Sequence, residues 1–479
     1  MILVISIVSY FYFKPKEETI PSGKFKTDIS FISTKLATIP DKYKLFPQYV
    51  DFSPVGRSVA YVVSDGEKQI MIIGSNESKR YDFVGYQNYS YDGKLIGYVA
   101  INGDASQAVI SNQENPKNDL VYSGKSISFA PNSYKVIYKE ADGRKVRYVI
   151  DGSKGNYYDS VDDLIFSPDG KKFAYKAVKF GYYGGESGGT KVVSGIVEGG
   201  HYSEDQSYIG VESIKFSPDS KNLYYEAYRE TEYPQQESTI VINGNEGKWY
   251  TSINGFVVGK DNKLGFIAKQ GNESFLVTNG IEGERFYEKR SAYSAIGSLT
   301  ASLDGQTIGY EVNKQENRGA YYVIGDKKEK EYEAVQGLTF SPDGKNYAYI
   351  AYQNKKYFAV VNGKESLSRS DLIAQIYMGE ENKIVYRARK EGTNKYFVTI
   401  NNVDGPTYDN VTAISFSPKT NRVIYIGRRD KKSFLVIDGV EKTSYDWIDD
   451  KLLKFNGDGQ KVAFGVKSGN ELWWIAEDI

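Results

Sequence analysis

The sequence predicts an all-β protein, a β-propeller of about eleven four-stranded blades. A segment at residues 165–177 returns almost unchanged at residues 339–351 and residues 215–227, and weaker copies fill most of the chain. The copies recur at roughly 40 residues, which is the usual period of a propeller blade. A second turn motif follows each copy. Together these two hairpins supply the four strands of each unit.

The repeated segment has the composition of a β-hairpin. An apolar run ends at Phe166, and Ser-Pro-Asp-Gly follows at residues 167–170. Proline presets one backbone angle, aspartate bonds its own backbone and glycine accepts positive φ, so this tetrapeptide is typical of a tight turn. β-prone residues resume at residues 173–175. The segment therefore predicts the first two strands of a blade.

The second motif is an apolar run that ends in Asp-Gly or Asn-Gly, as at residues 149–152, residues 241–244 and residues 436–439. Such dipeptides between apolar runs are strong hairpin signals. They predict strands three and four. A tyrosine also recurs in the second strand, and we expect it to pack between blades with its hydroxyl on a partner. The recurring tyrosines are Tyr175, Tyr225, Tyr310, Tyr349, Tyr386 and Tyr425.

Eleven blades exceed the usual 4–8 of one ring. Two fused rings, residues 28–254 and residues 255–479, are therefore the preferred arrangement, with one oversized ring or an open array as the alternative. The last unit supplies only three strands. Residues 28–39 alternate in polarity and are expected to supply the fourth, which would join the two ends of the chain and remove an exposed sheet edge.

Residues 1–27 are expected to be the remnant of a hydrophobic anchor or signal, followed by a linker. Residues 1–13 are apolar, and a charged, proline-containing stretch follows. The stretch is shorter than the roughly 20 residues that span a bilayer, so an N-terminal strand packed on the fold is the alternative. The preferred interpretation places the protein outside the cytoplasm, in the periplasm or at the cell surface, with a membrane tether at its N-terminus.

Composition excludes several functions. Lysine plus arginine and aspartate plus glutamate each number 61, so the formal charge is zero and no nucleic-acid partner is expected. The chain contains no cysteine, which excludes disulfides, thiolate metal sites and cysteine nucleophiles. His201 is the only histidine, which excludes a zinc site with several imidazoles. No cofactor is expected.

No catalytic or metal-binding residue is predicted. Residues 185–189 match the G-x-S-x-G pattern around Ser187, but the only histidine follows fourteen residues later and no α/β domain surrounds it. We interpret this stretch as a glycine-rich loop. Two aspartate clusters are interpreted as turn and capping residues rather than a calcium site. They comprise Asp159, Asp162 and Asp163, and Asp446, Asp449 and Asp450.

The two repeated turns of each blade open on one face of the ring, here called the repeat-turn face. The other connections open on the opposite face, here called the irregular-loop face, where function is expected. Two irregular loops, at residues 179–192 and residues 228–236, fall on consecutive blades. Exposed tyrosine and arginine are common anchors of protein contacts. The candidate binding residues are Phe180, Tyr182, Tyr183, Tyr228, Arg229 and Tyr233.

The Phe-Ser-Pro-Asp-Gly-Lys segments at residues 166–171 and residues 340–345 resemble the TolB-type propeller repeat, a relative of the WD repeats. Such repeats occur in many bacterial cell-envelope proteins, in non-catalytic TolB-like proteins and in the propellers of prolyl-oligopeptidase-like peptidases. The chain lacks the separate N-terminal domain of a TolB protein and has more blades. The resemblance therefore implies kinship of the repeat and an envelope setting.

The leading expectation is an envelope-associated propeller that is not an enzyme and that binds a protein or peptide partner through the irregular-loop face. One alternative is an enzyme that cleaves glycan or peptide at a site in the propeller channel, because paired carboxylates can come from different blades. The other alternative is a structural surface protein.

Overall fold

The structure is a computed structural model that describes residues 29–479, apart from residues 112, 115–126, 132, 134, 182–187, 199–200, 232–234, 289–294, 315–318 and 367–370. Every regular element in these residues is a β-strand. No helix that could span a bilayer occurs in this part of the chain. The expected N-terminal anchor, residues 1–27, lies outside the described residues.

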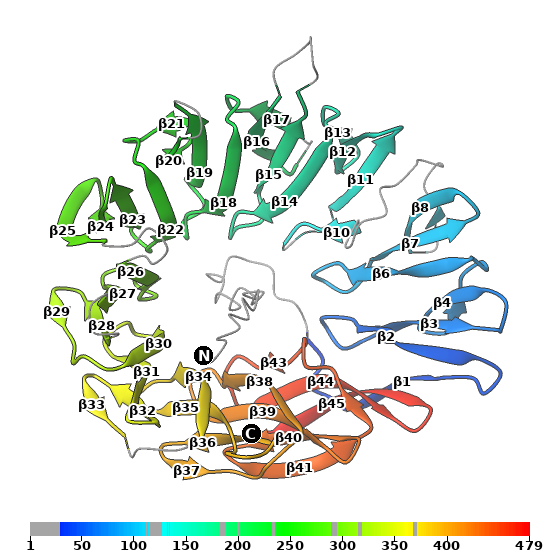
Figure 1. Cartoon of the computed structure of the whole chain (residues 1–479). Coiled ribbons are helices and arrows are strands. Elements are labelled where there is room, and N and C mark those ends of the chain that lie inside the picture. Colours follow the sequence, from blue (N-terminus) through cyan, green and yellow to red (C-terminus); the bar gives the residue numbers. More distant parts are fainter. Residues whose placement is uncertain are drawn as a thin grey trace.

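The strands form eleven antiparallel blades in a ring, each four strands deep, and in the eleventh blade two short strands, β42 and β43, share the innermost position, so the predicted fold class is confirmed (Figure 1). The preferred arrangement as two fused rings is wrong, and the alternative of one oversized ring describes the molecule. Blades five and six share one apolar cluster that includes Tyr224 and Phe256, so packing continues across the middle of the chain. The proposed domain boundary between residues 254 and 255 falls inside a strand, and a division into two domains stays a prediction.

The first strand of each blade lies nearest the centre of the ring (Figure 1). In blades one to ten these strands are β2 (Lys44–Phe52), β6 (Phe83–Tyr89), β10 (Ile127–Phe129), β14 (Ser160–Phe166), β18 (Gly210–Phe216), β22 (Ser252–Val258), β26 (Ile296–Ala301), β30 (Ala334–Phe340), β34 (Leu372–Met378) and β38 (Asn410–Phe416). The second strands are β3 (Val59–Ser64), β7 (Ile96–Asn102), β11 (Val136–Asp142), β15 (Lys172–Lys179), β19 (Leu223–Glu230), β23 (Leu264–Gln270), β27 (Ile308–Lys314), β31 (Tyr347–Gln353), β35 (Ile384–Arg389) and β39 (Val423–Arg429).

The third strands are β4 (Gln69–Ile73), β8 (Ala105–Ile110), β12 (Lys145–Ile150), β16 (Gly189–Ile196), β20 (Gln236–Ile242), β24 (Glu273–Thr278), β28 (Gly319–Ile324), β32 (Lys356–Val361), β36 (Tyr396–Ile400) and β40 (Lys432–Ile437). The outermost strands are β5 (Asn76–Glu77), β9 (Gln113–Glu114), β13 (Ser153–Lys154), β17 (His201–Glu204), β21 (Asn245–Glu246), β25 (Ile281–Tyr287), β29 (Lys327–Lys328), β33 (Lys364–Glu365), β37 (Val403–Asp404) and β41 (Val440–Tyr445).

The eleventh blade is built from both ends of the chain. It contains β42 (Trp447–Ile448), β43 (Lys454–Phe455), β44 (Lys461–Ser468), β45 (Glu471–Asp478) and β1 (Thr34–Thr38). β1 pairs antiparallel with β45, and Thr34 lies opposite Trp474. The closing strand predicted within residues 28–39 is therefore observed, and it covers the edge that the last blade would otherwise expose.

The repeated turn is held by its own side chains. In blade four the Ser167 hydroxyl donates to the Asp169 carboxylate at 2.6 Å and accepts a hydrogen bond from the Lys172 backbone N–H at 2.9 Å. Gly170 has φ of 71°, and a Cβ there would lie 2.1 Å from the Pro131 carbonyl oxygen in the preceding blade. Glycine is required because the turns of neighbouring blades touch at this point.

The repeated tyrosines pack between blades, as expected. Tyr175 and Tyr225 are fully buried, and each belongs to an apolar cluster that joins its blade to the preceding one. The Tyr225 hydroxyl donates to Asp205 at 2.9 Å. The Tyr175 hydroxyl finds no hydrogen-bond partner among the described residues, so the expectation of a partner for every hydroxyl is wrong. Ring burial, rather than a hydroxyl contact, is the common role of this position.

Candidate functional site

Strand order assigns the connections to the two faces. Each blade runs first, second, third, fourth strand from the centre outward, and each neighbour is antiparallel. The first and third connections of a blade therefore lie at one end of the strands. The second connection and the link to the next blade lie at the other end. The first set is the repeat-turn face and the second set is the irregular-loop face.

Half of the predicted binding residues lie in the described part of the chain. Tyr182, Tyr183 and Tyr233 lie outside it. Phe180 directly follows β15, and this residue is 59% exposed. Its backbone N–H donates to Asp159 at 2.8 Å, which fixes the start of the loop. The role of this patch in binding stays a prediction.

Tyr228 and Arg229 lie in β19 rather than in a loop, so the predicted start of the second loop was too early. The Tyr228 hydroxyl donates to Glu212 at 3.3 Å. The Arg229 guanidinium donates to Glu237 at 2.6 Å and lies 4.1 Å from the centre of the Trp249 ring. Both side chains already have partners within blade five, so a ligand would have to compete for them.

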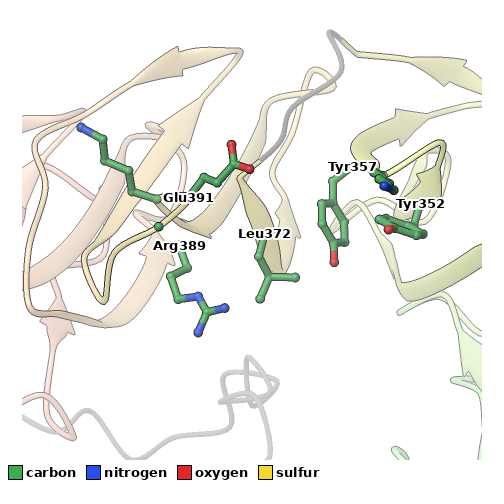
Figure 2. A pocket seen from close by; sticks show the side chains of 8 residues that line it. Tyr352, Tyr357, Leu372, Arg389 and Glu391 are labelled. Atoms are coloured by element: carbon green, nitrogen blue, oxygen red, sulfur yellow. The ribbon is translucent and has the colours of Figure 1, made fainter. Parts of the chain in front are cut away.

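A hollow between blades eight and nine opens on the irregular-loop face and was not predicted. It has a volume of about 280 Å³, and we call it the blade 8–9 hollow. Figure 2 shows Arg389 and Tyr357 on opposite sides of Leu372. Its lining residues are Tyr352, Lys355, Tyr357, Leu372, Arg389, Lys390, Glu391 and Gly392.

Two hairpins position these side chains. Tyr352 and Tyr357 are cross-strand partners in β31 and β32, with ring centres 4.9 Å apart. Asn354 and Lys355 between them have φ of 51° and 60°, as a two-residue type I′ turn requires. In blade nine Leu372 of β34 and Arg389 of β35 are cross-strand partners. Residues directly opposite each other share one face of a sheet, so the strand register sets the spacing of the hollow.

The hollow carries an excess of positive charge. Lys355, Arg389 and Lys390 line it beside one acidic residue, Glu391, and all four are exposed. Within the described chain, no ion pair or side-chain hydrogen bond joins the three cationic side chains to another residue. The Glu391 backbone N–H donates to Asp371 at 2.8 Å and anchors the loop.

The Tyr357 hydroxyl in the hollow stays protonated and can donate a hydrogen bond at neutral pH. Burial raises the pKa of Tyr357, the neighbouring Tyr352 raises it further, and Arg389 opposes both effects. A neutral phenol can donate a hydrogen bond while its ring offers apolar area. The hollow therefore combines cations that have no ion-pair partner among the described residues, a hydroxyl donor and two half-buried aromatic rings.

The two aspartate clusters make local contacts. Asp159 accepts hydrogen bonds from Lys145 at 2.7 Å and from the Phe180 backbone. Asp446 accepts them from Lys432 at 2.6 Å and from the Gly469 backbone. No group of three or more acidic or histidine side chains suited to a metal ion occurs among the described residues. Ser187 lies outside them.

One carboxyl group in the blades, that of Glu226, is unusual because it is almost fully buried. Glu226 of β19 is 2% exposed, and its Oε1 has no hydrogen-bond partner among the described residues. It lies opposite Glu212 of β18. Burial raises the pKa of Glu226 to about 7, and the charge of Glu212 adds to that rise. This group therefore titrates near neutral pH, but its burial keeps it from contact with a ligand.

Fold and topology define this protein as a β-propeller. No protein-family model and no curated protein matches the sequence. Several solved structures are similar to this chain at low identity and low TM-score. A eukaryotic initiation factor matches 77% of this chain and 95% of its own at 12% identity and a TM-score of 0.43. The propeller domain of the Trilobed protease from Pyrococcus furiosus matches 59% and 94% at 15% identity and a TM-score of 0.32.

Enzymes occur among the similar structures. The acylaminoacyl peptidase of Pyrococcus horikoshii matches 70% of this chain at 12% identity and a TM-score of 0.30, and this chain spans 55% of the peptidase. A puromycin hydrolase matches 62% at 12% identity and a TM-score of 0.29. The expectation that the protein is not an enzyme is therefore corrected: peptidase and hydrolase structures are among those similar to this chain. These similarities extend to the fold alone.

Proposed function

We propose that this protein binds a protein or peptide partner through its irregular-loop face. The observation that carries the proposal is the blade 8–9 hollow, where exposed cations that form no ion pair with any described residue lie beside two half-buried tyrosines. Arginine and tyrosine contribute much of the binding energy at protein interfaces. On the repeat-turn face, by contrast, the polar groups of the turns bond to one another, as Ser167 and Asp169 do.

The size of the hollow supports a peptide ligand over a cofactor. Small-molecule sites usually occupy roughly 300–1,000 Å³ and bury most of their ligand. The hollow, at about 280 Å³, is open along exposed residues such as Lys355 and Gly392. Space of this size suits one or two side chains of a longer ligand whose remainder lies across the loop face.

The partner contact is tested by capture with matched variants of the full chain. Immobilised wild-type protein is compared with Arg389→Ala and Tyr357→Ala on the irregular-loop face and with Lys171→Ala on the repeat-turn face. We expect the same envelope protein to be retained by the wild type and by Lys171→Ala and to be lost from the other two. Retention by all variants, or equal loss from Lys171→Ala, would contradict the proposal.

We also propose that the protein belongs with the TolB-type repeat proteins of the cell envelope and is tethered through its N-terminus. The Phe-Ser-Pro-Asp-Gly-Lys repeats and the apolar residues 1–13 support this placement. A fusion to a reporter that is active only outside the cytoplasm tests it. We expect activity with residues 1–13 present and none after their deletion. A reporter that stays inactive with residues 1–13 in place would contradict the proposed location.

A further inference from the structure

We propose that the blade 8–9 hollow binds an acidic peptide segment, with a carboxylate on Arg389 and a neighbouring apolar side chain against Tyr352 and Tyr357. The inference rests on the proposed function and names the chemistry of its ligand. It depends on three features of the hollow: an arginine with no acceptor among the residues that the structure describes, a tyrosine pair and a local charge excess.

Blade ten shows that an arginine at the position of Arg389 can bind a carboxylate. Arg389 and Arg428 occupy the same position in blades nine and ten, three residues after the repeated tyrosines Tyr386 and Tyr425. Arg428 donates to the Asp450 carboxylate at 3.1 Å and to the Ile448 carbonyl oxygen at 3.4 Å, both supplied by the next blade. No described residue supplies such an acceptor to Arg389. The Arg428 contact lies between blades ten and eleven, whereas the hollow lies between blades eight and nine, so this pair shows that an arginine at this position can bind a carboxylate and does not place the ligand.

The geometry of arginine favours a carboxylate in this position. Its planar guanidinium presents paired donors that match the two oxygens of a carboxylate. Lys355 and Lys390 line the same hollow and add positive charge without a fixed direction. The whole chain has a formal charge of zero, so this excess is a local feature of the hollow. Such an excess attracts acidic segments and fixes their orientation.

The tyrosine pair supplies the apolar part of the site. The Tyr352 and Tyr357 rings meet at 50° with their centres 4.9 Å apart, and both are half-buried. Leu372 lies between Tyr357 and Arg389 (Figure 2). An aromatic or aliphatic ligand side chain beside the acidic one would gain contact area here, and the protonated Tyr357 hydroxyl would donate to its backbone or carboxylate.

Phosphate and nucleic acid fit the site less well. Nucleic-acid binding depends on an extended basic stripe, whereas three cations line this hollow beside Glu391. Phosphate sites commonly use several backbone N–H groups. The backbone N–H of Glu391, at the edge of the hollow, already donates a hydrogen bond to Asp371. The chemistry of the hollow therefore favours a carboxylate beside an apolar group.

Fluorescence anisotropy of the full-length protein tests the inference. The probe is a fluorescein-labelled peptide, Gly-Glu-Glu-Phe-Glu-Gly, and its match carries glutamine in place of each glutamate. We expect the acidic probe to bind and Arg389→Ala to weaken its affinity at least about tenfold, because a hydrogen bond between two charged groups is stronger than one between neutral groups. Lys356→Ala, an exposed neighbour outside the lining, should change the affinity less than about twofold.

A charge exchange sharpens the test. Arg389→Glu should lose the acidic probe and gain affinity for a lysine version of the peptide. Equal binding of the glutamine peptide, no effect of Arg389→Ala, or stronger competition by inorganic phosphate or single-stranded DNA than by free acidic peptide would each overturn the inference. If partner capture still depends on Arg389 and Tyr357 while the acidic probe does not bind, the inference fails and the proposed function stands. Unchanged thermal unfolding of each variant excludes a loss of fold.

Discussion

The Trp474 indole donates a hydrogen bond from Nε1 to the carbonyl oxygen of Ser30 at 2.7 Å, across 444 residues of sequence. Trp474 lies in β45 and is completely buried. Its ring packs near Phe52 of blade one, with ring centres 6.5 Å apart. One side chain thus joins the eleventh blade to the segment before β1 and to the first blade.

Replacing Trp474 should weaken ring closure. We expect Trp474→Ala to cost about 3–5 kcal/mol, because it removes a large buried ring and leaves a cavity. Trp474→Phe keeps part of the ring and loses the hydrogen bond, so it should cost less. Denaturant unfolding measures both, with Trp473→Phe as the control because the Trp473 Nε1 donates to Glu471 within the same strand, at 3.0 Å. An equal effect of the Trp473 variant would contradict this role.

Alanine substitutions at Gly56 and Gly74 separate steric contact with the Trp474 ring from the cost of the backbone conformation. Gly56 and Gly74 both have positive φ, 70° and 61°. A Cβ on Gly56 would lie 2.1 Å from the Trp474 ring, whereas a Cβ on Gly74 would meet nothing within 4 Å. Alanine at either site costs roughly 1–2 kcal/mol for its backbone conformation. Gly56→Ala should lower the midpoint of thermal unfolding clearly further than Gly74→Ala. Equal shifts would show that the indole gives way.

Two buried glutamates should give opposite pH dependences. Burial, then the charge of Glu212, raises the pKa of Glu226 to about 7. Its stabilising protonated form is therefore fully present below the unfolded pKa of about 4.3 and is lost as the pH rises through 7. Glu226→Gln keeps the neutral form at every pH. We expect it to raise the free energy of unfolding at pH 8 and to change it little near pH 4.

Glu140 serves as the matched control for that experiment. Burial alone would raise its pKa, but hydrogen bonds and charges from Lys154 and Arg147 lower it overall. Its stabilising ionised form is present above the unfolded pKa and is lost as the pH falls through the folded one. Glu140→Gln should therefore destabilise the protein at pH 8 and have less effect in acid. The same sign for both variants at pH 8 would contradict the two assignments.

The repeat-turn motif should matter for stability and not for binding. Ser167→Ala removes the hydrogen bonds to Asp169 and from the Lys172 N–H, and we expect a cost of about 1 kcal/mol or more because the site is buried. Partner capture should be unchanged, since this turn lies on the face opposite the hollow. Loss of capture by folded Ser167→Ala protein would assign the repeated turns a direct role in binding.

Most of the architecture was predictable because each blade is specified locally. Ser-Pro-Asp-Gly and Asn-Gly turns set the hairpins, and the missing fourth strand of the last blade predicted β1. The number of rings was not predictable in this way. It depends on the angle between neighbouring blades, which many small contacts set together, such as Phe173 and Tyr175 against Ala130 and Ile137. The period of the sequence repeat gives the number of blades but not the angle between neighbouring blades.

The candidate site could not be predicted from loop length, because long irregular loops give the stronger signal in the sequence. The hollow is instead formed by short hairpins, and its parts meet only because blades eight and nine are neighbours. Tyr352 and Arg389 occupy the same position of consecutive repeats, three residues after Tyr349 and Tyr386. An alignment of the repeats places them on adjacent blades. It does not reveal that, within the described part of the chain, no carboxylate binds Arg389 as Asp450 binds Arg428.

The pairing of β1 with β45 also has a consequence for biosynthesis. Residues 34–38 leave the ribosome long before residues 471–478, and synthesis at roughly 5–20 residues per second separates the two events by tens of seconds. During that time β1 has no strand to pair with, and blade one has no eleventh blade beside it. The nascent strand is short, only five residues, and contains Lys35. Short length and a lysine both discourage pairing with other chains. The unpaired β1 segment therefore has little tendency to aggregate before β45 is synthesised.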